Sequence, residues 1–112
     1  RQFDTSVAKG AFPIDLHKPG GASMEYIRLN RSYSIPMESL ISADVGNLFM
    51  GGRCISCTHK AQASVRITAT SMATGQSAGV MAAVSALNGS VMNDLNYREI
   101  RKILLNQNMI LA

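Results

Sequence analysis

The chain has 112 residues, a length that fits one domain or part of one. Hydrophobic residues make up 46%, but thirteen of them are alanine, aromatic residues are only 5% and tryptophan is absent, so the apolar content consists largely of small side chains. The net charge of +4 comes from eleven Lys and Arg residues that are scattered without a basic stripe between aromatics, which argues against a nucleic-acid partner.

Small side chains suit places where backbones approach each other or a ligand closely. This composition therefore suggests a segment that completes a larger body. The chain starts at Arg1 rather than Met, and its first residues show neither the basic nor the apolar region of a signal sequence. We expect it to begin within a longer protein, and the sequence does not indicate a compartment.

The N-terminal third is divided by glycine and proline. Residues 11–16 and 24–29 are predicted to form short strands, and Lys18-Pro19-Gly20-Gly21 between them is typical of a turn. Residues 33–41 form a third extended candidate, in which Pro36 requires an edge position or a bend.

A short apolar run at residues 47–50 ends abruptly in Gly51-Gly52. This pattern is typical of an interior strand of a parallel sheet that meets a tight turn, where the backbone approaches a ligand. Residues 53–67 are expected to form a loop after this corner.

Residues 68–88 are predicted to form a long helix, capped by Thr68 or Thr70 and stopped by Gly89 in the left-handed conformation. One face carries Met72, Gln76, Val80, Ala83 and Leu87, and an adjacent face carries only Gly75, Gly79, Ala82 and Ala86. The bare face allows another element to pack closely. The many Thr, Ser and Gln residues make the stretch too polar for a membrane span, so no membrane is expected.

The last predicted element is a helix at residues 97–107. Asn96 and Glu99 are placed as a capping box, Ile100, Ile103 and Leu104 form its apolar face, and Asn108 stands where a helix ends in the left-handed region.

The run from Cys54 to His59 contains a C-x-x-C pair. Covalent haem attachment would need His directly after Cys57, where Thr58 stands. A zinc site would need four ligands, and beyond Cys54, Cys57 and His59 only His17 is available, so no metal is expected. A redox dithiol normally lies where a helix begins, whereas a loop is predicted here. We interpret the pair as two reduced residues packed beside a tight turn.

Several motifs together resemble the FAD-dependent oxidoreductase family, which belongs to the glutathione-reductase-like flavoproteins. The matching residues are Asp15-Leu16-His17, the segment Tyr33 to Ile41, Gly51 to Ser56, then His59, Ala61, Ser64 and Arg66, and Gly75 to Gly79. The resemblance covers nearly the whole chain. It implies an α+β fragment of an α/β FAD-binding fold, with residues 1–42 on the substrate side and residues 43–112 as the C-terminal part of the FAD-binding domain.

The resemblance also implies roles for individual residues. Gly51, Gly52 and Arg53 would lie near the ribityl and pyrophosphate of FAD, although many relatives have an acidic residue where Arg53 stands. The start of the long helix, with Thr70, Gly75 and Gln76, would face the flavin. His59 and Arg66 are the catalytic candidates, as a proton-transfer group and a carboxylate clamp respectively.

These inferences predict a C-terminal fragment of an FAD-dependent oxidoreductase that transfers a hydride to or from a small organic substrate. No G-x-G-x-x-G motif is present, so the rest of the parent polypeptide is the expected partner, and the fragment alone is expected to lack FAD and activity. The alternatives are a small stand-alone α+β interaction module without catalysis and a C-x-x-C redox or metal protein.

Overall fold

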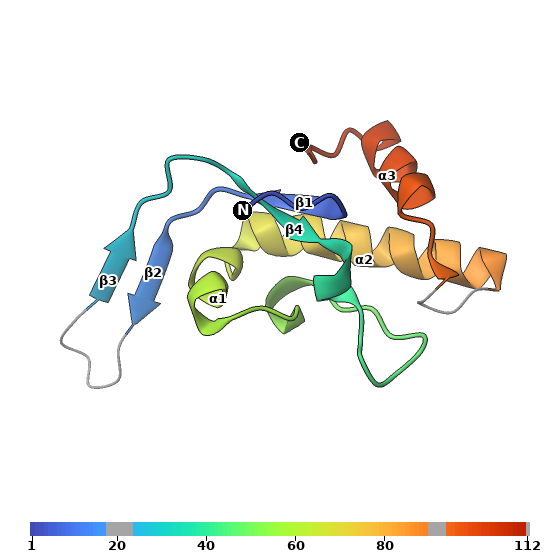
Figure 1. Cartoon of the computed structure of the whole chain (residues 1–112), viewed down its shortest axis with the longest axis horizontal. Helices are drawn as coiled ribbons and strands as arrows, with labels where there is room; N and C mark the ends of the chain where they lie inside the picture. The colour runs from blue at the N-terminus through green and yellow to red at the C-terminus, as the bar shows by residue number, and fades with distance from the viewer. Residues whose placement is uncertain (18–23, 90–93, 112) are drawn as a thin grey trace.

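The computed structural model describes residues 1–17, 24–89 and 94–111. Two small antiparallel sheets and two shorter helices are arranged around one long helix, which runs along the molecule (Figure 1). The principal axes measure 51 × 29 × 20 Å. The predicted combination of short strands, a long helix rich in small residues and a C-terminal helix is confirmed.

The first sheet joins two segments that lie far apart in the sequence. Strand β1 (Ser6–Gly10) pairs antiparallel with β4 (Tyr33–Pro36), and a register shift between Ser6 and Ala8 marks a bulge at Val7. Strand β1 was not predicted, because its sequence lacks an alternation of large apolar and polar residues. The 3-10 helix η1 (Met37–Leu40) follows Pro36, so the predicted strand 33–41 ends earlier than expected.

The second sheet is a two-stranded hairpin that projects from one end of the molecule (Figure 1). It consists of β2 (Ile14–His17) and β3 (Met24–Ile27), close to the two predicted strands. Strand β2 begins after Pro13, which has no N–H to donate to a ladder. The predicted turn at residues 18–21 lies outside the described residues.

The prediction of a buried, parallel strand at residues 47–50 is wrong. Phe49 forms a single antiparallel bridge with Ile41, and the Met50 N–H donates to the Leu40 carbonyl at 2.7 Å. The Leu48 side chain is 45% exposed. Within the described residues, this run therefore pairs with the antiparallel segment that precedes it in the chain, and not with a distant parallel strand. The 3-10 helix η2 (Gly52–Cys54) then follows.

A short helix, α1 (His59–Val65), occupies part of the predicted loop, which corrects that prediction. The Thr58 Oγ1 accepts a hydrogen bond from the Ala61 N–H at 3.2 Å and so caps the helix. The signal was present in the sequence, since Thr58 precedes a run with no Gly or Pro.

Helix α2 (Thr68–Asn88) has the predicted bounds, and Gly89 stops it at φ 60°. The predicted cap is wrong, because Ile67 holds the N-cap position and no side chain caps the helix. The buried face also differs from the faces considered in the sequence. It carries Thr70, Thr74, Ser77, Met81, Val84 and Ser85. Met72 and Leu87 are 71% and 87% exposed, because short hydroxyl side chains let α2 approach β1 and the Gly51-Gly52 corner more closely.

Helix α3 (Tyr97–Asn106) begins at its predicted cap, where the Asn96 side chain accepts from the Arg98 N–H. The Glu99 carboxylate accepts from Asn88 Nδ2 at 3.4 Å, so it links α3 to the end of α2. Asn108 has φ 61°, as predicted for the residue that ends this helix.

The core lies where α2, β1, β4 and α3 meet. Among the described residues its buried members include no aromatic side chain and, apart from one alanine, are Val, Ile, Leu and Met, which are larger than the small side chains that the composition favours. Its buried members are Val7, Ala8, Ile35, Met37, Leu40, Ile55, Val65, Met81, Val84, Ile100, Leu104 and Leu111.

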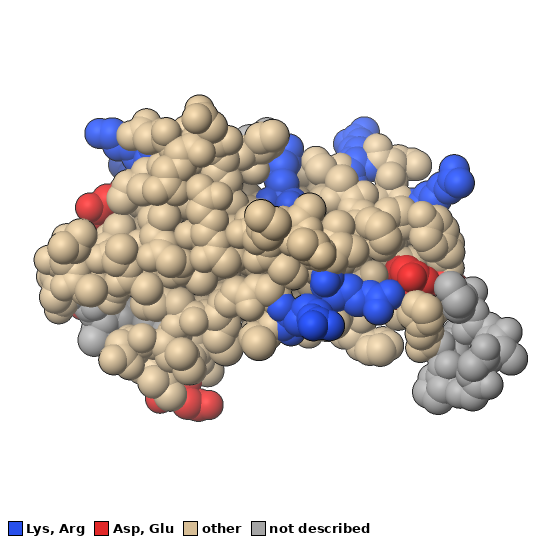
Figure 2. Space-filling model, turned by 180° about the vertical axis from the view of Figure 1, so that it is seen from behind, with Lys and Arg blue, Asp and Glu red and all other residues tan. Residues whose placement is uncertain are grey.

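The charged surface is discontinuous. On the face seen in Figure 2, Lys and Arg side chains lie in separate groups divided by wide uncharged areas. No helix in the part of the chain that the structure describes combines the length and the apolar character that crossing a bilayer requires. The absence of a nucleic-acid partner stays a prediction.

Candidate functional site

The Gly51-Gly52 corner lies directly against helix α2. A Cβ atom added to Gly51 would stand 2.8 Å from the Gly75 Cα, so any side chain at position 51 would collide with the helix backbone. Gly52 has φ +68°, a conformation that favours glycine. The absence of a side chain at Gly51 therefore allows a backbone-to-backbone contact between segments 24 residues apart in the sequence.

One hydroxyl group fixes the corner to the helix. The Gly52 N–H donates to Thr74 Oγ1 at 2.8 Å, and Thr74 Oγ1 in turn lies 3.1 Å from the carbonyls of Thr70 and Ser71. The Thr74 side chain is fully buried. It was not predicted as a site residue, although its position one residue before Gly75 was a usable signal.

The contact leaves part of α2 uncovered. A Cβ atom at Gly75 or Gly79 would meet nothing within 4 Å, and Ala82 and Ala86 are exposed as well. The bare face expected from the sequence is therefore an open surface beside the corner.

The start of α2 is free of side-chain caps. Helices α1 and α3 begin with a capping side chain, whereas α2 begins at Thr68 with none. The first N–H groups of a helix have no partner within the helix and carry a partial positive charge, so they favour an anionic or electron-rich group.

The remaining candidates for cofactor binding lie in three different environments. Arg53 is exposed in η2. Thr70 is only 3% exposed, so its side chain does not share the open surface with Gly75. The Gln76 Nε2 donates to Gln107 Oε1 at 2.8 Å, which connects α2 to the end of α3.

The two catalytic candidates stand at opposite ends of α1. His59 is its first residue and is exposed, while Arg66 is the C-cap. They are seven positions apart, which places them about 10 Å apart along the axis and on the same side of the helix. The two side chains do not contact each other. Both belong to the segment between the corner and the start of α2.

Arg66 has a partner that the sequence did not reveal. Its Nη2 lies 3.2 Å from Asp15 Oδ2, and His17 Nε2 lies 3.2 Å from the same oxygen. Asp15 and His17 are two residues apart in β2, so their side chains point to the same face of the strand. That alternation was visible in the sequence, but the approach of Arg66 from α1 was not.

The C-x-x-C pair lies beside the start of α1, which removes one argument against a redox dithiol. Cys54 and Cys57 are free and exposed, and Cys57 Sγ donates to Gln62 Oε1 at 3.1 Å. Partial burial raises the pKa of the Cys57 thiol, whereas a reactive thiol needs a lowered pKa. Within residues 1–17, 24–89 and 94–111, no three His, Cys, Asp or Glu side chains lie where they would hold a metal ion.

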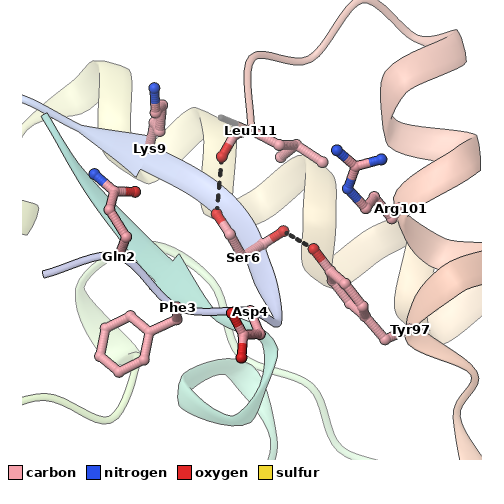
Figure 3. Close-up of a pocket in the computed structure, with 8 residues that line it drawn as sticks. All are labelled: Gln2, Phe3, Asp4, Ser6, Lys9, Tyr97, Arg101 and Leu111. Atoms are coloured by element: carbon pink, nitrogen blue, oxygen red, sulfur yellow. Dashed lines mark hydrogen bonds between the residues drawn. The ribbon is translucent and has the colours of Figure 1, made fainter.

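A cavity of about 410 Å³ lies between β1, α3 and Leu111 (Figure 3). There the Tyr97 hydroxyl donates to the Ser6 carbonyl at 2.9 Å and the Ser6 hydroxyl donates to the Leu111 carbonyl at 3.1 Å. These bonds fasten α3 and the tail to β1. A larger cavity is a groove of about 720 Å³ between β4, the connections of the hairpin, and α1.

A model of the FAD dependent oxidoreductase family matches residues 1–104. The chain belongs to this family. Comparison with curated proteins and with solved structures returned no match. Family membership implies FAD as the cofactor of the parent enzyme, and the observed α+β arrangement agrees with part of an FAD-binding domain.

Proposed function

We propose that this chain supplies one wall of the flavin site in an FAD-dependent oxidoreductase of the glutathione-reductase-like type. The contact between Gly51 and Gly75 carries the proposal, because it joins the corner to α2 and leaves an open surface next to the joint. The rest of the site, including the glycine-rich turn that grips the pyrophosphate, would come from another part of the parent polypeptide.

The residues at the joint fit a flat, electron-rich group. Gly52 and Gly75 have no side chains, so such a group can approach the backbone closely. The uncapped N–H groups at the start of α2 would bind its negatively polarised edge. Arg53, exposed in η2, would pair with a phosphate group.

Bound FAD would supply the hydride acceptor or donor for a small organic substrate. The chain's own residues would position the substrate and move protons. In this proposal the Arg66 guanidinium, oriented by Asp15, holds a carboxylate, and the exposed His59 imidazole exchanges a proton at neutral pH.

The open surface of α2 would be covered by the parent polypeptide. Met72 and Leu87 are large apolar residues that are 71% and 87% exposed, and the stripe of small residues lies beside them. Surfaces of this kind usually mark an interaction site. The 112-residue chain alone is expected to purify without the yellow colour of flavin.

A leucine at position 75 tests the proposal in the full-length enzyme. The Gly75→Leu variant should fold normally, because the position is open and leucine favours helix over glycine. It should nevertheless weaken FAD binding by about tenfold or more, since the new side chain occupies the flavin surface. FAD content and affinity are measured from the visible absorbance of the flavin.

The matched control is Lys102→Leu, an exposed position on α3. It should bind FAD as the wild type does. FAD binding by Gly75→Leu at wild-type affinity would show that the flavin does not lie against this part of α2.

A further inference from the structure

The groove of about 720 Å³ is separate from the corner, since none of Gly51, Gly52 and Gly75 lines it. It is built from β4, the segments that lead into and out of the hairpin, the loop before α1, and α1 itself. Its volume lies within the range of about 300 to 1,000 Å³ that is typical of small-molecule sites.

The walls of the groove are mostly apolar. Tyr33 and Ser64 contribute polar atoms, but these are already paired. The Ser64 hydroxyl donates to the Phe12 carbonyl, so the Tyr33 hydroxyl, 2.7 Å away, must be the donor to Ser64. The main apolar contributors are Phe3, Ile14, Leu29, Ile35, Ile55 and Val65.

The charge at the groove has a single sign. Arg1, Arg31 and Lys60 line it, and no Asp or Glu is present among its described lining residues. Both ion pairs in the described part of the chain involve Asp15, so neither Arg31 nor Lys60 is neutralised by an acid. The Arg1 guanidinium lies 4.9 Å from the centre of the Phe3 ring, at the wall of the groove.

The titratable groups in the groove do not offset this charge. Burial raises the pKa of the Tyr33 hydroxyl, and partial burial raises the pKa of the Cys57 thiol. Both groups are therefore uncharged at neutral pH. An apolar trough with unpaired cations at its edge is complementary to a molecule with an apolar body and an anionic end.

We propose that this groove binds an organic anion with an apolar body, such as a carboxylate that carries a hydrocarbon chain, at a site apart from the proposed flavin surface. The anionic end would lie near Arg31 and Lys60, and the apolar body would lie along the Ile14, Ile35 and Val65 walls.

Three probes of equal chain length test the proposal in the full-length enzyme supplied with FAD. They are decanoate, 1-decanol and decyltrimethylammonium, each titrated below its aggregation concentration by calorimetry. We expect saturable binding in the order decanoate, decanol, decyltrimethylammonium. Raising the salt concentration should weaken decanoate binding and leave decanol unchanged.

Two variants locate the binding. The double variant Arg31→Gln/Lys60→Gln should weaken decanoate about tenfold and leave decanol unchanged. The matched control Arg98→Gln/Lys102→Gln changes two exposed cations on α3 that do not line the groove, and it should bind like the wild type. Ala61→Phe, which fills the groove from α1, should weaken both decanoate and decanol.

Three outcomes would overturn the proposal: no saturable decanoate binding, equal affinity for the cationic probe, or the same loss in the α3 control as in the groove variant. The flavin absorbance of each variant is recorded in parallel. In the wild type, no saturable decanoate binding while FAD is bound would overturn the groove proposal alone, whereas decanoate binding without FAD binding would overturn the flavin proposal alone.

Discussion

At the scale of single residues, Thr74 has the most consequential side chain of the candidate site. It is fully buried, and its hydroxyl accepts from the Gly52 N–H while it donates within α2. A backbone N–H group that is removed from water needs an acceptor, because otherwise it loses its hydrogen bonds to water and gains none in the protein. Thr74 therefore determines whether the corner keeps its conformation.

Replacing Thr74 by valine tests this role with almost no change in shape. The Thr74→Val variant leaves the Gly52 N–H without its acceptor, and the free energy of unfolding should fall by about 1–3 kcal/mol. The matched control, Thr68→Val at an exposed position of the same helix, should change it by less than about 0.5 kcal/mol. Urea unfolding measures both. Equal losses in the two variants would show that the hydroxyl bond does not stabilise the corner.

The sequence identified some residues of the site and not others. Gly51 and Gly52 were singled out because glycine at a corner signals a close backbone approach, and Gly51 does lie against the backbone of α2. The pairing of Arg66 with Asp15 was not found, because the two residues are 51 positions apart and no local pattern links them. Their roles in catalysis stay predictions.

At the scale of elements, the two small sheets differ in what covers them. The β1–β4 sheet packs on α2, and Val7 and Ala8 are fully buried. At the bulge, the Val7 carbonyl accepts from the buried Ser77 hydroxyl, so the irregular position is satisfied by α2. The β2–β3 hairpin is half-exposed along β2, and it projects from the body. A two-stranded hairpin has little stability of its own.

This difference predicts unequal hydrogen exchange. Backbone amides of the β2–β3 hairpin should exchange about 100-fold faster than those of β1 and β4, because opening the hairpin exposes little apolar surface. Amide exchange followed by mass spectrometry or NMR makes the comparison within one molecule, so β1–β4 serves as the internal control. Equal protection in both sheets would mean that the hairpin unfolds together with the core.

The elements also show where local signals suffice. The bounds of α2 and the ends of α2 and α3 were predicted correctly, since Gly89 and Asn108 are local stop signals that both adopt the left-handed conformation. The run at residues 47–50 was mistaken for a parallel strand, because a short apolar run does not specify which backbone it pairs with.

At the scale of the whole molecule, two partly buried groups link stability to pH. Partial burial raises the pKa values of Tyr33 and Cys57, so the folded chain holds these protons more tightly than the unfolded chain. The unfolded chain loses the thiol proton as pH rises above the ordinary value of about 8.5, and the tyrosine proton above about 10. Each stabilising contribution is full below that ordinary value and is lost as pH rises through the raised folded value.

We therefore expect the free energy of unfolding to fall above about pH 8 as the contribution of Cys57 is lost, and to fall further above about pH 10 as that of Tyr33 is lost. The Cys57→Ser variant should show a flatter decline, while the control Cys54→Ser should follow the wild type. Urea unfolding across this pH range measures the three slopes. A Cys57→Ser slope equal to that of the wild type would remove Cys57 from the explanation.

The sequence by itself determined the bounds of α2, the ends of both longer helices, the glycine corner and the family resemblance. These features depend on propensities and stop signals within a few residues of one another. The tertiary structure decided the β1–β4 pairing, the face of α2 that is buried, the Asp15–Arg66 pair and the groove with its unpaired cations. Each of these features is a contact between segments that are distant in the sequence. The stability of such a contact depends on the packing of the whole chain and not on local spacing.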